Sequence, residues 1–256
     1  MYLSKIENSL IHHKEEVLKH LQCESQLVGV FLYGSQNYNL ATENSDVDTV
    51  AIVLPTTKEL YFNKPVTKEI HLDNGEHIVV KDIREFMNML RKQNLNFMEV
   101  LFTKFYYINP LYQNLWNLFL VNRERIARYN PELAVKSITG QILHTLNQAF
   151  NSFEGKKYAN ALKMYYFLEK YLNLQLNYAD IIIPTKEEKE LILKYKNNEI
   201  NFSYGDIINL TVKVKKLSEN NNFIINEEEK ENIEYTMNYY SYKMINKNLE
   251  YTPYHF

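Results

Sequence analysis

The sequence predicts an α+β fold with a mixed N-terminal part, residues 1–110, and an all-helical C-terminal part, residues 111–256. In the first part, apolar runs of strand type alternate with segments of helical periodicity. From about residue 111 glycines become rare and helix-start signals take over. A chain of 256 residues, 45% of them apolar, has room for one or two globular domains with a sizeable core.

The first expected element is an amphipathic helix over residues 3–22, in which Ile6, Leu10 and Leu21 recur at helical spacing. Two apolar runs of strand type follow this helix. Pro55 ends the second run, because proline cannot donate to the hydrogen-bond ladder of a sheet.

A β-hairpin is expected over residues 66–81, because Asn74-Gly75 is the strongest signal for a two-residue hairpin turn. This turn would pair Asp73 with Glu76. The resulting register predicts which side chains share a face of the hairpin. One face would carry Glu69, His71, Asp73 and Glu76, and the other Ile70, Leu72, His77 and Val79.

Asp82 is expected to begin the next helix. Asp82 and Glu85 have the Asp-x-x-Glu form of a capping box, and Phe86 and Leu90 follow at helical spacing. We therefore interpret Asp82 as a helix cap rather than a metal ligand.

The C-terminal part contains three clear helix-start signals. They are Asn130-Pro131-Glu132, Pro184-Thr185-Lys186 and Asn226-Glu227-Glu228. These signals predict four to six helices packed as an antiparallel bundle, with the active site between the two parts of the chain.

The most informative feature of the chain is a pair of neighbouring motifs in the first two strands. The run VGVFLYGS ends in Gly34 and Ser35, and the run SDVDTVAIV opens on Asp46 and Asp48. Because side chains alternate along a strand, the two carboxylates point the same way and can hold one or two divalent cations. Gly34 permits close approach of a phosphate, and Ser35 offers a hydroxyl and an N–H group. The pair of motifs indicates metal-dependent phosphoryl or nucleotidyl transfer.

This arrangement resembles the signature of the DNA polymerase β-type nucleotidyltransferase superfamily. The surrounding sequence is similar to the phage and bacterial branch of predicted nucleotidyltransferases related to RNA-repair polymerase β-like proteins. The segments that carry the resemblance are YGSQNYNLATENSDVD (33–48), VKDIREF (80–86), NLNFMEVLF (94–102), KYANALK (157–163) and PTKEEKELILKYK (184–196). The resemblance implies a nucleotidyltransferase fold, Mg²⁺ or Mn²⁺ as cofactor and a nucleoside triphosphate as substrate.

The resemblance also implies roles for individual residues. Asp46 and Asp48 would hold the metal, and Gly34 and Ser35 would contact the β- and γ-phosphates. A third carboxylate usually completes such a site, yet the expected strand reads HIVVK and contains no acid. Glu76 is the best acidic candidate beside that strand, and His77 is a competing base or ligand.

Cationic side chains are needed to bind a triphosphate. Lys81 and Arg84 lie near the catalytic strands, and Lys156, Lys157 and Lys163 lie on a helix of the second part, with Lys157 and Lys163 on one side of it. The resemblance favours Lys157 and Lys163 over an ordinary solvated helix face. Tyr38, next to the Gly-Ser motif, is a candidate for stacking on the base, with a core position as the alternative.

Composition limits the partners and the location. A net charge of −2 gives no overall attraction to nucleic acid, and the single Cys23 excludes an internal disulfide and fits a reducing cytoplasm. We expect no targeting or membrane segment, and a cytoplasmic location, in the host if the gene is phage-encoded. The richness in Lys, Asn, Ile and Tyr suggests a source of low GC content.

Three functional hypotheses follow. The first is a nucleotidyltransferase that moves an NMP from an NTP to a hydroxyl of RNA such as tRNA, of a protein or of a small molecule. The second is a degenerate module that binds a nucleotide or RNA without turnover, which a missing third acid would permit. The third is a phage effector that contacts a host defence protein.

Overall fold

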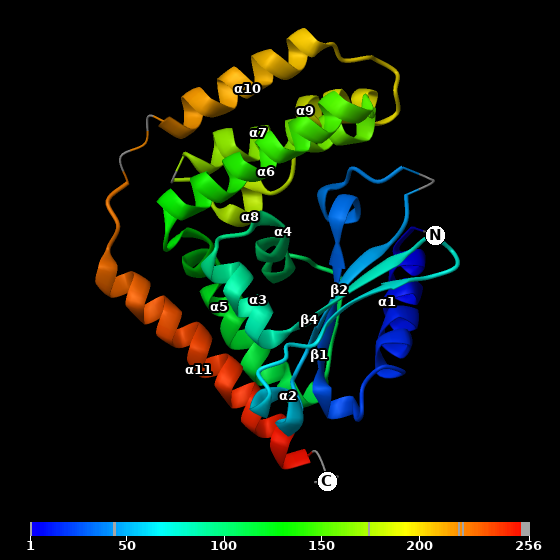
Figure 1. Cartoon of the computed structure of the whole chain (residues 1–256), viewed down its shortest axis with the longest axis vertical. Coiled ribbons are helices and arrows are strands. Elements are labelled where there is room, and N and C mark those ends of the chain that lie inside the picture. Colours follow the sequence, from blue (N-terminus) through cyan, green and yellow to red (C-terminus); the bar gives the residue numbers. More distant parts are fainter. Residues whose placement is uncertain (1, 43–44, 174, 220, 222, 252–256) are drawn as a thin grey trace.

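A computed structural model describes residues 2–42, 45–173, 175–219, 221 and 223–251. Its N-terminal part is built on a five-stranded sheet with the strand order β3-β4-β2-β1-β5. Strands β2 and β4 are parallel, whereas the other neighbours are antiparallel, so the sheet is mixed. Helices cover both faces of this sheet, and a helical region follows (Figure 1). The predicted α+β fold is confirmed.

The strands are β1 (Leu27–Tyr33), β2 (Asp48–Val53), β3 (Thr67–His71), β4 (His77–Asp82) and β5 (Tyr106–Ile108). The first four coincide with the strands expected from the apolar runs and the hairpin. The short edge strand β5 was not predicted, because it contains no apolar run of strand type, and it forms by pairing with β1. Residues Glu24–Gln26 form a short 3-10 turn ahead of β1.

Helix α1 (Tyr2–Leu18) covers one face of the sheet (Figure 1). Side chains of β2 alternate between the faces, so Ala51 and Val53 pack with α1 whereas Val50 and Ile52 enter the larger core on the opposite face. This alternation fixes which side chains of β2 can meet the rest of the molecule.

Helix α3 (Ile83–Arg91) packs on the opposite face of the sheet. Asp82 caps it by accepting a hydrogen bond from the N–H of Arg84 at 2.9 Å, as the sequence predicted. Trp116 fills the space between sheet and helices, with its ring 4.6 Å from that of Phe31 and 6.2 Å from that of Phe86. Two shorter helices, α2 (Thr57–Tyr61) and α4 (Leu95–Met98), complete this part, and 3-10 turns occupy Glu99–Leu101 and Pro110–Tyr112.

The hairpin exists, but the predicted two-residue turn was wrong. The N–H of Leu72 donates to the carbonyl of Glu76, which leaves three residues in the loop, and only Gly75 of these has a positive φ, 87°. A three-residue loop with one left-handed glycine is the next most common hairpin connection. The register therefore shifts by one residue, and His71 pairs with His77.

This shift corrects the predicted faces of the hairpin. Glu69 and His71 share a face with His77 and Val79, whereas Ile70 lies opposite Ile78 on the α1 face. Because the side-chain period of a strand is two, a shift of one residue in the register moves one strand's side chains to the other face relative to its partner.

The helical region contains α5 (Gln113–Arg128), α6 (Pro131–Ser152), α7 (Gly155–Tyr171), α8 (Tyr178–Ile181), α9 (Lys186–Lys196), α10 (Tyr204–Glu219) and α11 (Glu227–Tyr251). Helices α6, α7, α9 and α10 pack together, whereas α11 runs along α5 and α3 beside the sheet (Figure 1). The helical region therefore consists of a group of four packed helices, α6, α7, α9 and α10, and the separate helix α11, which lies against α5 and α3. No helix of the described residues is long and apolar enough to cross a membrane.

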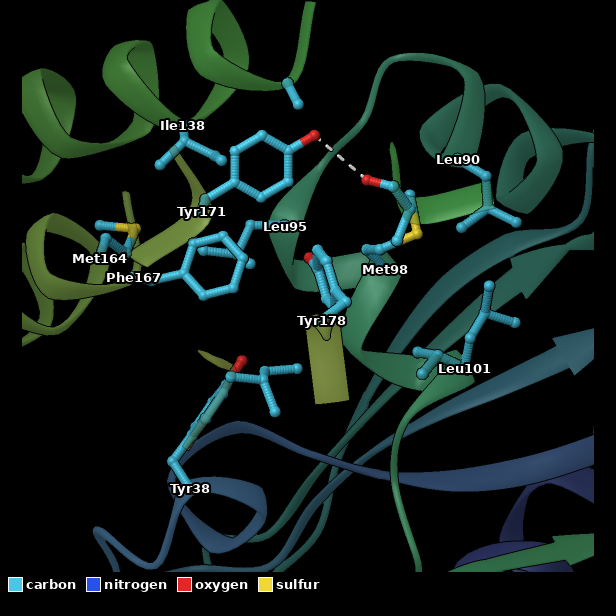
Figure 2. Close-up of a cluster of buried hydrophobic side chains, with 14 of the residues drawn as sticks. Tyr38, Leu90, Leu95, Met98, Leu101, Ile138, Met164, Phe167, Tyr171 and Tyr178 are labelled. Atoms are coloured by element: carbon cyan, nitrogen blue, oxygen red, sulfur yellow. Dashed lines mark hydrogen bonds between the residues drawn. The ribbon is translucent and has the colours of Figure 1, made fainter. Parts of the chain in front are cut away.

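One apolar core connects the sheet to the helical region. Figure 2 shows Tyr38, Met98, Met164 and Tyr178 in one cluster, although they come from well separated segments. The boundary at residue 110 stays a prediction, since this core extends across it.

Candidate active site

Asp46 and Asp48 lie at the start of β2. Val47, between them, is fully buried with the side chains beneath α1, so both carboxylates point to the opposite face. Asp48 is half-buried and Asp46 is exposed. Burial raises the pKa of Asp48, and the negative charge of Asp46 raises it further. The two carboxylates thus concentrate negative charge at one edge of the sheet.

The loop after β1 lies directly beside this pair. Gly34 has a φ of 77°, in the left-handed region, and a Cβ atom placed there would lie 3.7 Å from Oδ2 of Asp48. The chain then forms a 3-10 turn over Gly34–Tyr38, which ends at Asn39 with φ 56°. Ser35 is in the first turn and is half-buried. Gly34 and Ser35 are therefore brought together with Asp48, as their predicted roles require.

Hydrogen bonds hold the loop in place. The amide of Gln36 donates to the backbone carbonyl of Asp46 at 3.2 Å. The amide of Asn37 donates to the carbonyl of Leu32 at 2.7 Å, and the Thr103 hydroxyl donates to the side-chain oxygen of Asn37 at 2.7 Å. These bonds tie the two motifs to each other and to the sheet.

Glu76 faces α1 rather than the side of the sheet that carries Asp48. The hydroxyl of Ser9 donates to one of its carboxylate oxygens at 3.0 Å, and Nε2 of His13 lies 3.0 Å from the other. Nδ1 of His13 is 2.8 Å from the Thr49 hydroxyl. Burial raises the pKa of Glu76, but the hydrogen bonds outweigh burial and lower the pKa overall. The structure thus places Glu76 in a buried network under the sheet.

His77 occupies the position on β4 that lies next to Asp48. Thr49 pairs with Ile78 across the parallel strands β2 and β4, so the preceding residues, Asp48 and His77, are neighbours on the other face. His77 counteracts the rise in the pKa of Asp48. Of the two candidates for the third position, the structure brings His77, and not Glu76, to the face of the carboxylate pair.

The predicted cations lie in different surroundings. Lys157 is paired at 2.8 Å with Glu154, the residue that precedes α7. Arg84 is bound to Asp82 at 2.7 Å, and Lys81 lies over the ring of Phe97 at 5.9 Å. His77 lies at the start of β4, whereas Lys81 is near the other end of this strand, roughly 13 Å away, and Arg84 follows it in α3. The structure does not bring these three cations to Asp48.

Two further lysines lie near the site: Lys156, which the resemblance did not favour over Lys157 and Lys163, and Lys196, which no motif indicated. Lys156 is exposed at the start of α7, and its charge lowers the pKa of Asp48 across the space between the sheet and α7. Lys196 of α9 donates to the carbonyl of Leu40 at 2.7 Å. Lys156 lies just outside the quoted segment KYANALK, so the resemblance favoured Lys157 in its place.

Comparison with known proteins agrees with this geometry. Residues 13–101 match the nucleotidyltransferase domain family, and the match contains both motifs and the hairpin. The chain carries a nucleotidyltransferase domain of the polymerase β-like superfamily.

A crystal structure of a nucleotidyltransferase-like protein from Exiguobacterium sibiricum 255-15 is also similar to the chain. It is 11% identical in sequence, covers 80% of this chain and 73% of its own, and has a TM-score of 0.32. This similarity is low, so the assignment rests on the family match. No curated protein is significantly similar in sequence.

Glu99, which is buried, and Lys163 lie behind the Gly-Ser loop of the nucleotidyltransferase domain. The N–H of Gly34 donates to Oε1 of Glu99 at 3.4 Å. Burial raises the pKa of Glu99 to about 8 and lowers the pKa of Lys163, while the attraction between the two groups opposes both shifts. The Lys163 ammonium lies 3.8 Å from the ring centre of Tyr38, which is itself buried. Lys163 and Tyr38 therefore support the loop from behind.

Glu99 lies within the quoted segment NLNFMEVLF, which was the available signal for it. The sequence could not show that its carboxyl group reaches the Gly34 amide, because the two residues are far apart along the chain. The nucleotidyltransferase domain thus combines an exposed face, with Asp46, Asp48 and Ser35, and a buried support behind it.

Proposed function

We propose that this protein transfers an NMP group from a nucleoside triphosphate to a hydroxyl group, with a divalent metal ion at Asp46 and Asp48. The observation that carries the proposal is that Gly34, at the end of β1, lies next to Asp48, at the start of β2. Both residues lie in the part of the chain that matches the nucleotidyltransferase domain family. A phosphate that approaches Gly34 would therefore come next to the carboxylates.

The residues present fit a hard divalent ion such as Mg²⁺ or Mn²⁺. Asp46 and Asp48 offer only oxygen ligands, which these ions prefer. The raised pKa of Asp48 reflects burial and repulsion from Asp46, and a bound cation would relieve both. When bound, such an ion neutralises charge that develops on the phosphates during transfer.

The chain's own groups would position the triphosphate. Gly34 leaves room for a phosphate oxygen, and the Ser35 hydroxyl can donate to it. Lys156 lies across the space between the sheet and α7. Of the lysines and arginines discussed above, it is the one whose charge lowers the pKa of Asp48. Glu76 would instead hold α1 against the start of β2 through Ser9 and His13.

The acceptor would be a hydroxyl group of RNA, of a protein or of a small molecule. The test is to incubate the protein with each α-labelled NTP, Mg²⁺ or Mn²⁺ and each class of acceptor, and to measure the label transferred. We expect labelled product with the wild-type protein and a loss of at least about 1,000-fold for Asp46→Asn and for Asp48→Asn, since removing one metal carboxylate costs several kcal/mol at the transition state. Asp73→Asn, an exposed carboxylate in the hairpin loop, serves as the matched control.

Equal turnover by folded Asp48→Asn and wild-type protein would refute the catalytic assignment. A nucleotide-binding module without turnover is the second candidate, and the observation that favours it is the histidine, not an acid, at the position next to Asp48. NTP binding by the wild type that depends on Asp46 and Asp48, with no label on any acceptor, would select this second candidate.

A further inference from the structure

We propose that the β3–β4 hairpin holds one Zn²⁺ ion between Glu69, His71 and His77, beside the carboxylate pair and distinct from it. The proposal does not depend on nucleotidyl transfer, because it rests only on the side chains of the hairpin.

The register of the hairpin creates the cluster. Glu69 and His71 are two residues apart on β3, so their side chains point to the same face. His71 pairs directly with His77 on β4, which places the second imidazole next to the first on that face. Three side chains of metal-ligand type therefore converge on one small area of the sheet.

The distances suit a metal ion that bridges the three groups. Nε2 of His77 lies 3.8 Å from a carboxylate oxygen of Glu69, and Nε2 of His71 lies 3.9 Å from the same oxygen. One ligand atom from each residue lies within 4.8 Å of the others. Two ligands of a tetrahedral zinc ion, each about 2 Å from it, are roughly 3.4 Å apart. The present separations are wider, between 3.8 Å and 4.8 Å, so the exposed side chains of Glu69 and His71 would move inward to bind the ion.

The buried end of the cluster lacks an internal partner. Nε2 of His77 is shielded from solvent and makes no hydrogen bond within the described part of the chain. The distance of 3.8 Å to Glu69 is too long for a hydrogen bond. The His71 and His77 rings stack 4.6 Å apart at 15°. An imidazole binds a metal ion in its ring plane, so the exposed His71 ring has to turn for both rings to bind one ion. A cation held between the ring nitrogens and Glu69 would satisfy the buried atom.

Ligand chemistry selects the ion. Two imidazoles and one carboxylate suit zinc or another late first-row divalent ion, whereas the oxygen-only pair Asp46 and Asp48 suits Mg²⁺. Three protein ligands leave a fourth position open to water. A zinc ion here would place positive charge next to Asp48, at the position where the sequence lacks a third acid.

The test uses metal-free, full-length protein and Zn²⁺ alone, titrated in competition with a chromophoric chelator. We expect one tight equivalent of Zn²⁺ in wild-type protein, and a loss of affinity of about 10- to 100-fold for His71→Ala and for Glu69→Gln. Both residues are exposed, so these variants should fold normally. An excess of Mg²⁺ should not displace the ion.

Two controls separate this site from its neighbours. His144→Ala, an exposed histidine on α6, should leave Zn²⁺ affinity unchanged. The double variant with Asp46→Asn and Asp48→Asn should also retain it, which distinguishes this site from the proposed catalytic metal site. Zn²⁺ binding that is lost in the double variant but kept in His71→Ala would overturn the proposal, as would no stoichiometric binding by the wild type.

Discussion

Lys156 and Lys157 are neighbours in the sequence, but they have different partners. Lys157 is held by Glu154 at 2.8 Å, whereas the charge of the exposed Lys156 reaches Asp48. A helix turns by about 100° per residue, so consecutive side chains face different directions. The direction of each side chain, and not the residue type, thus decides which lysine can meet a triphosphate.

We therefore predict that Lys156→Gln raises the KM for NTP about tenfold, because a charge-assisted contact with a phosphate is worth about 1.4 kcal/mol or more. Lys157→Gln is the matched control and should change KM by less than about twofold. Steady-state kinetics of label transfer, or equilibrium NTP binding, measures both. A larger effect in Lys157→Gln than in Lys156→Gln would contradict the assignment.

Glu99 makes a separate prediction, since burial raises its pKa from 4.5 to about 8 in the folded protein. The unfolded chain ionises this group near pH 4.5, whereas the folded protein keeps the proton until about pH 8. The contribution of Glu99 to stability is therefore fully present below pH 4.5 and is lost as the pH rises through about 8.

Glu99→Gln should remove this dependence, because glutamine stays neutral and can still accept the N–H of Gly34. We expect the stability difference, variant minus wild type, to grow by a few kcal/mol between pH 4.5 and 8, at about 1.4 kcal/mol per pKa unit. Urea unfolding across this range measures it, with the exposed Glu7→Gln as control. A difference that does not change with pH would show that Glu99 is ionised in the folded protein.

At the scale of elements, the position of α7 depends on one glycine. A Cβ atom at Gly155 would lie 2.2 Å from the carbonyl oxygen of Tyr195 in α9, which is far inside a normal contact. Gly140, in α6, has nothing within 4 Å of the same added atom. The two glycines are therefore a natural matched pair.

Gly155→Ala should destabilise the protein by on the order of 2–4 kcal/mol, because α7 and α9 would be forced apart. Gly140→Ala should instead be neutral or stabilising by about 0.5–1 kcal/mol, since alanine favours the helix. Urea unfolding of both variants provides the measurement. Similar changes in stability for both would mean that the close approach of α7 to α9 does not exist in solution.

Local sequence signals predicted the hairpin and the helix after it, but not the length of the hairpin loop. Asn74-Gly75 marked the hairpin, and Asp82 marked the next helix, both from nearby residues alone. The loop length between β3 and β4 was not determined by that dipeptide, because a three-residue loop accommodates the same glycine at positive φ. The difference of one residue decides which side chains of β3 lie beside His77, and it brings His71 there.

At the scale of the whole molecule, α11 returns to the N-terminal part and ends in a buried polar contact. Asn248 is fully buried, and its amide donates to the carbonyl of Pro55 at 3.1 Å, while the Ser25 hydroxyl donates to its side-chain oxygen at 2.9 Å. Arg125 binds Glu229 near the other end of the helix at 2.8 Å. The helix thus joins the sheet region to the helical region along its length (Figure 1).

We predict that Asn248→Ala lowers the free energy of unfolding by on the order of 2–3 kcal/mol, because buried hydrogen-bond partners would be left unsatisfied. The exposed Asn232→Ala on the same helix should change it by less than about 0.5 kcal/mol. Since one core connects both regions, circular dichroism and tryptophan fluorescence should report a single shared transition. Two separated transitions would show that the regions unfold independently.

The sequence alone determined the α+β class, the first four strands, the cap at Asp82 and the helical second part. It also determined that Asp46 and Asp48 point the same way, because side-chain alternation in a strand is a local property. The nucleotidyltransferase domain followed from the same motifs and is confirmed by the family match over residues 13–101, whereas the phage and bacterial branch stays a prediction.

Tertiary structure decided the rest, because it depends on contacts between distant residues. The pairing of β2 with β4 selected His77 for the face of Asp48, and the approach of α7 to the sheet selected Lys156. Packing behind the loop placed Glu99 under Gly34. Local periodicity is set within a few residues along the chain, whereas pairing register, helix approach and burial are set only when the whole core closes.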